Sequence, residues 1–496
     1  MIRGALAALC AALIGLLSLW GFSVDDAWII ARVAEHLRET GASVWNTGGP
    51  VTDAVTPWGF ERVVVAFGSL GFSSTFEAAR WLGVIAFLGT SCALGARLAR
   101  SSARFESWLV LLSGLALGVP AAAWAGAGLE TPVVGALVLT GAWSAESRDG
   151  RRFFGAFALG CAAAGRPELT PVLAVVLFAL TRWRPAALSS RISIGAIFAT
   201  PLVAVALARW LRFDSLVPLS AIAKAPSFAF GLRSALGGLF LAGAPALLLG
   251  TTLGRLRSSA TTEHVDSNEP SEARTLSLAR LGLVTLGVHV LAVLFAGGDW
   301  MPCFRLFVPM IPWWLWIAAA TARRRWFTWI GVALSLVGPA SYLIQFGADS
   351  RSVIERRLSW IERARPLLAS SRVVATVDIG WVGAAFPGTI VDLAGVTDPR
   401  IAHLPGGHTS KNVSPGLFAQ RDVDTWIVRA RGGDCVPPES LLEIFPVYFV
   451  DERLLRGAAD FGFEQVGCFA LEGTSDRYVV LRSATGVLGP GPSARE

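Results

Sequence analysis

The chain has 496 residues, of which 53% are hydrophobic and only 16% are charged, and its mean hydropathy is +0.55. Soluble domains carry about 25% charged residues, so this composition excludes an ordinary soluble protein and indicates a membrane protein. The formal net charge is +7, but the arginines cluster between apolar runs, which indicates membrane topology and argues against a nucleic-acid-binding face.

Apolar segments recur from the N-terminus to about residue 346. We expect about eleven transmembrane helices, at roughly 5–22, 75–98, 107–124, 130–145, 153–165, 168–182, 192–211, 231–253, 281–297, 304–321 and 327–346. The first segment has one early arginine and no small-residue cleavage site. We therefore interpret it as a retained span and not as a signal peptide.

Groups of arginines fall in alternate connections between these segments. They are Arg3; Arg97, Arg100 and Arg104; Arg148, Arg151 and Arg152; Arg182, Arg184 and Arg191; Arg255 and Arg257; and Arg323, Arg324 and Arg325. The positive-inside rule places these connections in the cytoplasm. The other connections then face outward: the loop 23–74, the turn around Glu130, the turn Arg166–Glu168, the segment 212–230 and the stretch Gly297–Arg305.

The character of the sequence changes after residue 346. Short β-rich runs alternate there with Gly/Pro turns: "RVVATVDIG", "TIVDLAG", "DTWIVRA", "VYFVD" and "RYVVLRS". We expect a polytopic α-helical membrane module over 1–346 and a soluble α/β domain over 347–496, outside the cytoplasm. Cys435 and Cys468 lie in that domain. They either form a disulfide with each other or remain two free thiols, and both alternatives are open.

The first outer loop begins with two adjacent aspartates, Asp25 and Asp26. From Asp26 to Thr40, apolar and polar residues alternate at helical spacing, and Gly41 ends the run, so we expect a short amphipathic helix at the membrane surface. Its expected apolar face is Ile30, Val33, Ala34 and Leu37, and its expected polar face is Arg32, Glu35, His36 and Glu39. One aspartate is explained as the N-cap. Adjacent carboxylates repel each other and cannot both cap, which leaves one for chemistry.

The other outward connections also carry ionisable residues: Glu130, Arg166, Glu168, Lys224, Asp299 and Arg305. Such residues are costly at membrane depth and are functional candidates by default. Each also has a structural interpretation, and Arg166 with Glu168 is the strongest case for a purely structural pair. Carboxylates can take a proton from a hydroxyl group, while arginine and lysine can hold a phosphate.

These residues lie in a pattern that resembles the GT-C-fold membrane glycosyltransferases, most of all the mycobacterial terminal arabinofuranosyltransferase family and its bacterial relatives. The matching residues of the first loop are Asp25-Asp26-Ala27, Val44 with Asn46, Gly48, Pro50-Val51 and Thr56-Pro57-Trp58. Further matches are Gly128-Leu129-Glu130-Thr131, Arg166-Pro167-Glu168, Pro218 with Lys224, Gly297 to Pro302 with Arg305, and Asp378, Gly380, Asp392, Gly395, Asp398 and Pro399. Two stretches depart from the pattern, Thr52-Asp53-Ala54-Val55 and Pro218-Leu219-Ser220, and both fall where the family contacts its substrate.

The resemblance implies transfer of a sugar, with inversion, from a polyprenyl-phosphate donor to an acceptor hydroxyl outside the membrane. It implies that Asp25 or Asp26 is the general base and that its partner orients the acceptor or binds a divalent cation, which is the one cofactor that the sequence suggests. Arg305, Lys224 and Arg166 would hold the donor phosphate. We assign substrate contacts to Asn46, Glu130, Glu168, Asp299, Trp300 and His408. A base at a helix N-terminus should have a lowered pKa, and we expect this of the aspartate that acts.

We therefore expect an enzyme of a bacterial cytoplasmic membrane, active on its outer face. Its acceptor would be an envelope glycan or glycolipid, and its donor sugar arabinofuranose or another pentofuranose. A hexose donor of the mannose type is the alternative within the class. A lipid-linked-sugar transporter, which should show related halves and midplane charges, and an envelope scaffold are the alternatives outside it.

Overall fold

We analysed a computed structural model of the chain. It describes all residues except 102, 148–149, 183–186, 225, 262–269, 324–325, 433–434, 436–439, 459–461 and 484–496. Arg148, Arg184, Arg324 and Arg325 of the arginine groups thus lie outside the described residues. The chain divides into two compact units. Unit 1 comprises Met1–Ser23, Ala79–Ala208 and Pro226–Arg351, and unit 2 comprises Val24–Ala78, Arg209–Ala225 and Ser352–Glu496.

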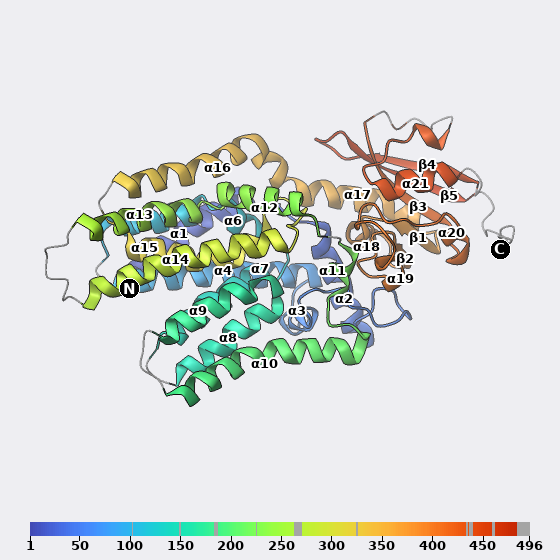
Figure 1. The fold of residues 1–496 in the computed structure, drawn as a ribbon. Coiled ribbons are helices and arrows are strands. Elements are labelled where there is room, and N and C mark those ends of the chain that lie inside the picture. Colours follow the sequence, from blue (N-terminus) through green and yellow to red (C-terminus); the bar gives the residue numbers. More distant parts are fainter. Residues whose placement is uncertain are drawn as a thin grey trace. The chain divides into compact units, whose positions relative to one another are not determined.

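Unit 1 is built of helices (Figure 1). They are α1 (Ile2–Ser18), α4 (Thr75–Arg100), α5 (Phe105–Ala116), α6 (Val119–Ala125), α7 (Thr131–Ala145), α8 (Arg151–Gly165), η1 (Pro167–Leu169), α9 (Thr170–Arg182), α10 (Leu188–Phe213), α12 (Phe228–Leu241), α13 (Ala244–Thr261), α14 (Pro270–Phe295), η2 (Arg305–Met310), α15 (Ile311–Thr321) and α16 (Trp326–Arg351). The first turn of α4 and the last residues of α10 belong to unit 2. Each predicted apolar segment is helical over most of its length.

Four helical stretches of the described chain are long and apolar enough to cross a membrane: α4, α10, Glu272–Phe295 and Trp326–Leu368. Two bent pairs, α5 with α6 at 49° and α12 with α13 at 70°, raise the number to six if each pair is one span. The bend between α12 and α13 falls at Gly243, whose φ of +67° is a conformation that favours glycine. The chain thus has the helices of a membrane protein, while the number of spans stays a prediction.

Small residues allow helices of unit 1 to pack closely, as in other membrane bundles. A Cβ on Gly155 of α8 would lie 2.3 Å from the backbone nitrogen of Ala145 in α7. The largest side chains buried in unit 1 are Trp124, Trp313, Trp314 and Phe307. Close backbone contact and buried aromatic rings together form its core.

Unit 2 contains a five-stranded mixed sheet of order β2-β1-β3-β5-β4 (Figure 1). The strands are β1 (Val373–Thr376), β2 (Thr389–Asp392), β3 (Thr425–Arg431), β4 (Phe463–Ala470) and β5 (Asp476–Ser483). β1 pairs in parallel with β2 and β3, and β5 pairs antiparallel with β3 and β4. The prediction of a strand in "VYFVD" is wrong, because α21 (Phe449–Ala458) begins there and buries Val450, Leu454 and Leu455 at helical spacing.

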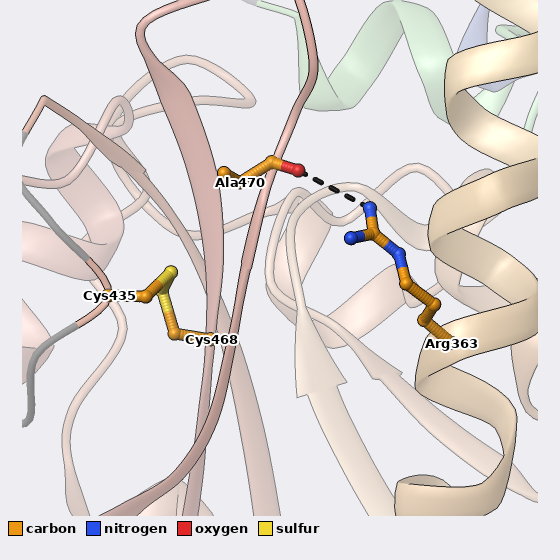
Figure 2. Close-up of a disulfide and its surroundings, with 4 residues drawn as sticks. All are labelled: Arg363, Cys435, Cys468 and Ala470. Carbon is orange, nitrogen blue, oxygen red and sulfur yellow. Dashed lines mark hydrogen bonds between the residues drawn. A yellow bond between two sulfur atoms is a disulfide. The ribbon is translucent and has the colours of Figure 1, made fainter.

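The other helices of unit 2 are α2 (Asp25–Thr40), α3 (Phe60–Gly68), α11 (Leu219–Ala223), α17 (Val353–Leu368), α18 (Ile379–Ala385), α19 (Pro399–Ala402), α20 (Gly416–Gln420) and η3 (Leu441–Glu443). A disulfide joins Cys435 to Cys468 in β4, with a Cα–Cα distance of 5.4 Å (Figure 2). Ala470 lies on the same strand, and its carbonyl oxygen accepts a hydrogen bond from Arg363 of α17 at 3.4 Å. Of the two alternatives for these cysteines, the structure therefore has the bonded one.

Candidate functional site

The two aspartates are the first two residues of α2. The N-cap is Val24, which makes no side-chain capping bond, so the interpretation of one aspartate as the N-cap of this helix is wrong. Both carboxylates lie in the first turn, where the helix dipole favours negative charge. At the other end, Gly41 has φ +75° and donates to the carbonyl oxygen of Leu37, so α2 ends where the sequence predicts.

Asp25 caps a different helix. Its Oδ2 accepts the N–H of Gly380 at 3.0 Å, and its Oδ1 accepts the N–H of Trp381 at 2.8 Å. These are the second and third residues of α18, whose first N–H groups have no partner within the helix. A Cβ on Gly380 would lie only 2.0 Å from the carbonyl oxygen of Asp25. Position 380 therefore needs glycine for α2 and α18 to approach this closely.

The expectation of a lowered pKa is wrong for Asp25. Burial raises the pKa of its carboxyl well above the ordinary value, and the nearby Asp378 raises it further. The two N–H bonds from α18 act in the opposite direction but do not outweigh burial. Only 9% of the surface of Asp25 is exposed. These properties suit a carboxylate that holds structure more than one that exchanges protons with a substrate.

Asp378 lies in a buried polar network at the start of α18. Its Oδ1 accepts the hydroxyl of Tyr448 at 2.6 Å, and its Oδ2 accepts the hydroxyl of Tyr478 at 2.5 Å. Arg429 approaches Oδ2 within 3.8 Å and pairs with Asp476 at 2.6 Å. The N-terminus of α18 is thus fixed from strands β3 and β5 as well as from α2.

Arg32 lies seven positions after Asp25 on α2 and contacts the other end of α18. Its guanidinium donates to the carbonyl oxygen of Trp45 and to four carbonyl oxygens between Gly383 and Gly388, at distances of 2.6–3.3 Å. Burial lowers the pKa of Arg32 to about 10. His36 is buried as well, so other parts of unit 2 cover part of the expected polar face of α2. No pattern in the local sequence indicates this role for Arg32.

Asp26 points to a different partner. Its Oδ2 lies 3.6 Å from the ammonium nitrogen of Lys224, and about one fifth of its side chain is exposed, as is about a quarter of the lysine side chain. Lys224 directly follows α11. The structure therefore brings together two of the predicted site residues, which are 198 positions apart in the sequence, in a place that a ligand can reach.

Buried polar contacts hold the segment that carries Lys224. Arg209 pairs with Asp53 at 3.1 Å, and Asp53 also accepts the N–H of Leu219 at 3.3 Å. The hydroxyl groups of Thr56 and Ser220 lie 2.6 Å apart. The two stretches that depart from the family pattern, 52–55 and 218–220, are thus in direct contact with each other.

Two other predicted substrate residues of unit 2 lie elsewhere. Both polar atoms of the Asn46 side chain are bonded to the backbone of Ile390 in β2, at 3.0 and 2.9 Å, which gives this residue a structural role. His408 is half-buried in the turn that follows α19. Its contact with substrate stays a prediction.

In unit 1, Arg166 is shared by two glutamates. It forms a buried ion pair with Glu130, lies 3.5 Å from Glu168, and donates to the hydroxyl of Thr131 at 3.3 Å. The sequence favours Arg166 with Glu168 as the structural pair, but the closer partner is Glu130. These contacts support the structural interpretation of all three residues.

Asp299 and Arg305 also form a pair, with Nε and Oδ2 2.7 Å apart. The guanidinium of Arg305 lies 5.7 Å from the ring centre of Trp124. Trp300 is 38% exposed in the turn between them. Both members of the pair are nearly covered, and phosphate binding by Arg305 stays a prediction.

Among the described residues, no three histidine, cysteine, aspartate or glutamate side chains gather in a way that could hold a metal ion. Both carboxylate oxygens of Asp25 are already engaged by N–H groups. Binding of a divalent cation by one of the two aspartates stays a prediction.

Comparison with known proteins yields a fold. No family model matches the sequence, and no curated protein matches it. Among solved structures, ArnT from Cupriavidus metallidurans bound to undecaprenyl phosphate is similar with a TM-score of 0.52 and 14% identity, covering 98% of each chain. The chain thus has the GT-C fold of this membrane protein, which confirms the prediction at the level of fold. The similarity does not reach the arabinofuranosyltransferase subfamily.

Proposed function

We propose that this protein is a membrane glycosyltransferase that transfers a sugar from a polyprenyl-phosphate donor to an acceptor hydroxyl. The observation that carries the proposal is the accessible pair of Asp26 and Lys224, a carboxylate and an ammonium 3.6 Å apart on a framework fixed by buried bonds. The fold supports it, because the similar structure is that of ArnT with undecaprenyl phosphate bound.

In this reaction Asp26 is the general base and Lys224 holds the donor phosphate. The acceptor oxygen forms a bond to C1 of the sugar while its proton passes to Asp26. The bond from C1 to the phosphate oxygen breaks on the opposite face, and its electron pair leaves with the polyprenyl phosphate, whose charge Lys224 stabilises. Attack on the opposite face inverts the configuration at C1.

The same geometry implies that the ion pair opens when the donor binds. Reacting atoms lie roughly 3 Å apart in line, so a base and a phosphate-binding cation on opposite sides of C1 must be further apart than the present 3.6 Å. Lysine has a flexible four-carbon stem, so its ammonium can move to the phosphate. This movement takes the lysine ammonium away from the carboxylate of Asp26, which we assign as the base. Asp25 positions this machinery through α18 and does not exchange the proton.

For the sugar, the resemblance of the first loop supports arabinofuranose or another pentofuranose, with a hexose of the mannose type as the alternative. The disulfide supports an outward location of the C-terminal part, because disulfides persist in oxidising compartments. The acceptor we propose is an envelope glycan or glycolipid on the outer face of a bacterial cytoplasmic membrane. Arg305 stays a candidate for a further phosphate contact.

A transfer assay tests this proposal. The purified full-length protein is given radiolabelled polyprenyl-phosphate pentofuranose or polyprenyl-phosphate hexose, with glycan acceptors, and the labelled product is measured. We expect transfer from one donor and a loss of about 10²–10⁴-fold in turnover for Asp26→Asn. Movement of the lipid-linked sugar across liposomes without any sugar transfer would instead favour a transporter.

A further inference from the structure

A large basic cavity lies in unit 1, and its lining contains neither of the proposed catalytic residues, Asp26 and Lys224. Its volume is about 880 Å³, within the usual range of ligand pockets. Six arginines line it: Arg97, Arg100, Arg104, Arg255, Arg274 and Arg323. Glu146 and Glu272 are the acidic residues among the described residues of its lining, so the described lining carries an excess of four positive charges.

The cavity lies where several helices of unit 1 begin or end. Arg97 and Arg100 are in the last turn of α4, Arg255 is near the end of α13, Arg274 is in the second turn of α14, and Arg323 follows α15. Helices α13, α14 and α15 pack against one another (Figure 1). These residues come from the connections that the positive-inside rule predicts to be cytoplasmic.

Ion pairs neutralise only part of this charge. Glu146 is bonded to both Arg97, at 3.0 Å, and Arg274. Glu272 is likewise shared by Arg255, at 3.8 Å, and Arg323. With each carboxylate already held by two guanidinium groups, neither can neutralise the remaining arginines.

Arg100 and Arg104 supply much of the remaining charge. Arg100 donates to the sulfur of Met1 at 3.0 Å, which is a neutral acceptor. Arg104 forms no ion pair within the part of the chain that the structure describes. A strongly basic, open cavity of this kind attracts an anion with more than one negative charge.

Aromatic residues indicate the depth at which this cavity lies. The guanidinium of Arg97 stacks over the rings of Trp143 and Trp316, at 4.6 and 4.9 Å from their centres. Trp316 itself lines the cavity. Tryptophan is enriched at the level of lipid headgroups, and basic pockets between transmembrane helices on the cytoplasmic side bind anionic headgroups.

We propose that this cavity binds the headgroup of an anionic phospholipid from the adjacent leaflet, and that a lipid with two phosphate groups, such as diphosphatidylglycerol, fits its charge best. Bidentate contacts of arginine with phosphate oxygens supply the recognition. The site is separate in its residues and chemistry from the proposed transfer reaction and does not depend on it.

The test measures the apparent Kd of diphosphatidylglycerol for the full-length protein in neutral detergent, with phosphatidylcholine and inorganic phosphate as parallel arms. The variant Arg100→Gln/Arg104→Gln removes two charges of the cavity. The control Arg151→Gln/Arg152→Gln removes two arginines of α8 that do not line the cavity. Each surface guanidinium contributes roughly fivefold, so we expect roughly 30-fold weaker binding in the first variant and little change in the control.

A third variant guards against misfolding. Glu272→Gln keeps all six arginines and adds one excess positive charge, so it should bind diphosphatidylglycerol roughly fivefold more tightly. Equal affinity for diphosphatidylglycerol and phosphatidylcholine, or equal weakening in the two double variants, would overturn the proposal. Saturation by inorganic phosphate at concentrations that displace the lipid would assign the cavity to a soluble anion and would overturn the lipid assignment as well.

Discussion

Asp25 and Arg32, seven positions apart on α2, hold opposite ends of the same short helix, α18. The carboxylate accepts N–H groups at its N-terminus, and the guanidinium donates to carbonyl oxygens at and beyond its C-terminus. Each charge thus meets the end of the helix dipole that favours it. α2 and α18 therefore run in the same direction and form one rigid support for Asp26.

This division of labour predicts different defects for the two aspartates. Asp26→Asn should lose about 10²–10⁴-fold in turnover with an unchanged melting temperature, because it removes a base from a partly exposed position. Asp25→Ala should lower the free energy of unfolding by about 1–3 kcal/mol, because it leaves two N–H groups of α18 without their acceptor. Thermal unfolding and a transfer assay on both variants separate the effects. The reverse pattern, a stable but inactive Asp25→Ala and an active Asp26→Asn, would make Asp25 the base.

The raised pKa of Asp25 predicts how stability depends on pH. A folded chain with a raised carboxyl pKa keeps a proton that the unfolded chain releases. This contribution is fully present below the unfolded value, near 3.8, and is lost as the pH rises through the folded pKa. The melting temperature of the wild type relative to Asp25→Asn should therefore fall as the pH is raised from about 4 to about 8. A difference that grows with pH would show that the folded carboxyl has a lowered pKa instead.

Gly380 should tolerate no side chain. Its added Cβ would lie 2.0 Å from the carbonyl oxygen of Asp25, so Gly380→Ala must push α18 away from α2 and move Asp26 with it. We expect a loss of activity together with a destabilisation of about 1–3 kcal/mol. The matched control is Gly416→Ala in α20, whose added Cβ would meet only the side-chain oxygen of Ser414, at 3.6 Å. That variant should keep its activity and its melting temperature, and equal behaviour of the two would contradict the close contact at position 380.

Arg32→Lys should be nearly as harmful as Arg32→Ala. A lysine ammonium has three donors in a compact group and cannot reach five carbonyl oxygens spread over two segments. We expect both variants to destabilise the chain by about 2–4 kcal/mol, measured as a fall in the midpoint of thermal unfolding. Wild-type stability in Arg32→Lys would mean that charge alone, and not the guanidinium geometry, is what unit 2 requires.

The disulfide closes a loop of 33 positions in unit 2. Loss of such a bond costs about 2–4 kcal/mol, chiefly because the unfolded chain gains freedom. Cys435→Ser/Cys468→Ser should therefore melt at a lower temperature than the wild type, and a reducing agent should lower the wild-type value to that of the variant. A reducing agent without effect on the wild type would show that the bond is absent from the purified protein.

The sequence anticipated the fold class better than the contacts of the site. Hydropathy predicts the helices because each apolar run is a local property, and four of the five β-rich runs do contain strands. The partners of Arg32 and Asp53 were not predictable, since they are about 350 and 156 positions away. For the same reason the sequence could name Asp25 and Asp26 as a pair but could not distinguish them. The distinction depends on Gly380 and Trp381, which are more than 350 positions away.

The two stretches that depart from the family pattern lie against each other in the structure. Taken separately, 52–55 and 218–220 are two unusual stretches near expected substrate contacts. In the structure, Asp53 of the first stretch accepts the N–H of Leu219 in the second. Next to the first stretch, the hydroxyl of Thr56 contacts the hydroxyl of Ser220 in the second. The two stretches are therefore joined directly, and the second of them leads into α11, which Lys224 follows.

The most direct test of the central claim is a single-turnover measurement with the preferred polyprenyl-phosphate sugar, comparing Asp26→Asn, Lys224→Met and Gly416→Ala with the wild type. We expect Asp26→Asn to slow sugar transfer about 10²–10⁴-fold with little change in donor affinity. Lys224→Met should weaken donor binding as well as transfer, and Gly416→Ala should behave as the wild type. Full transfer activity in a folded Asp26→Asn variant would contradict the central claim.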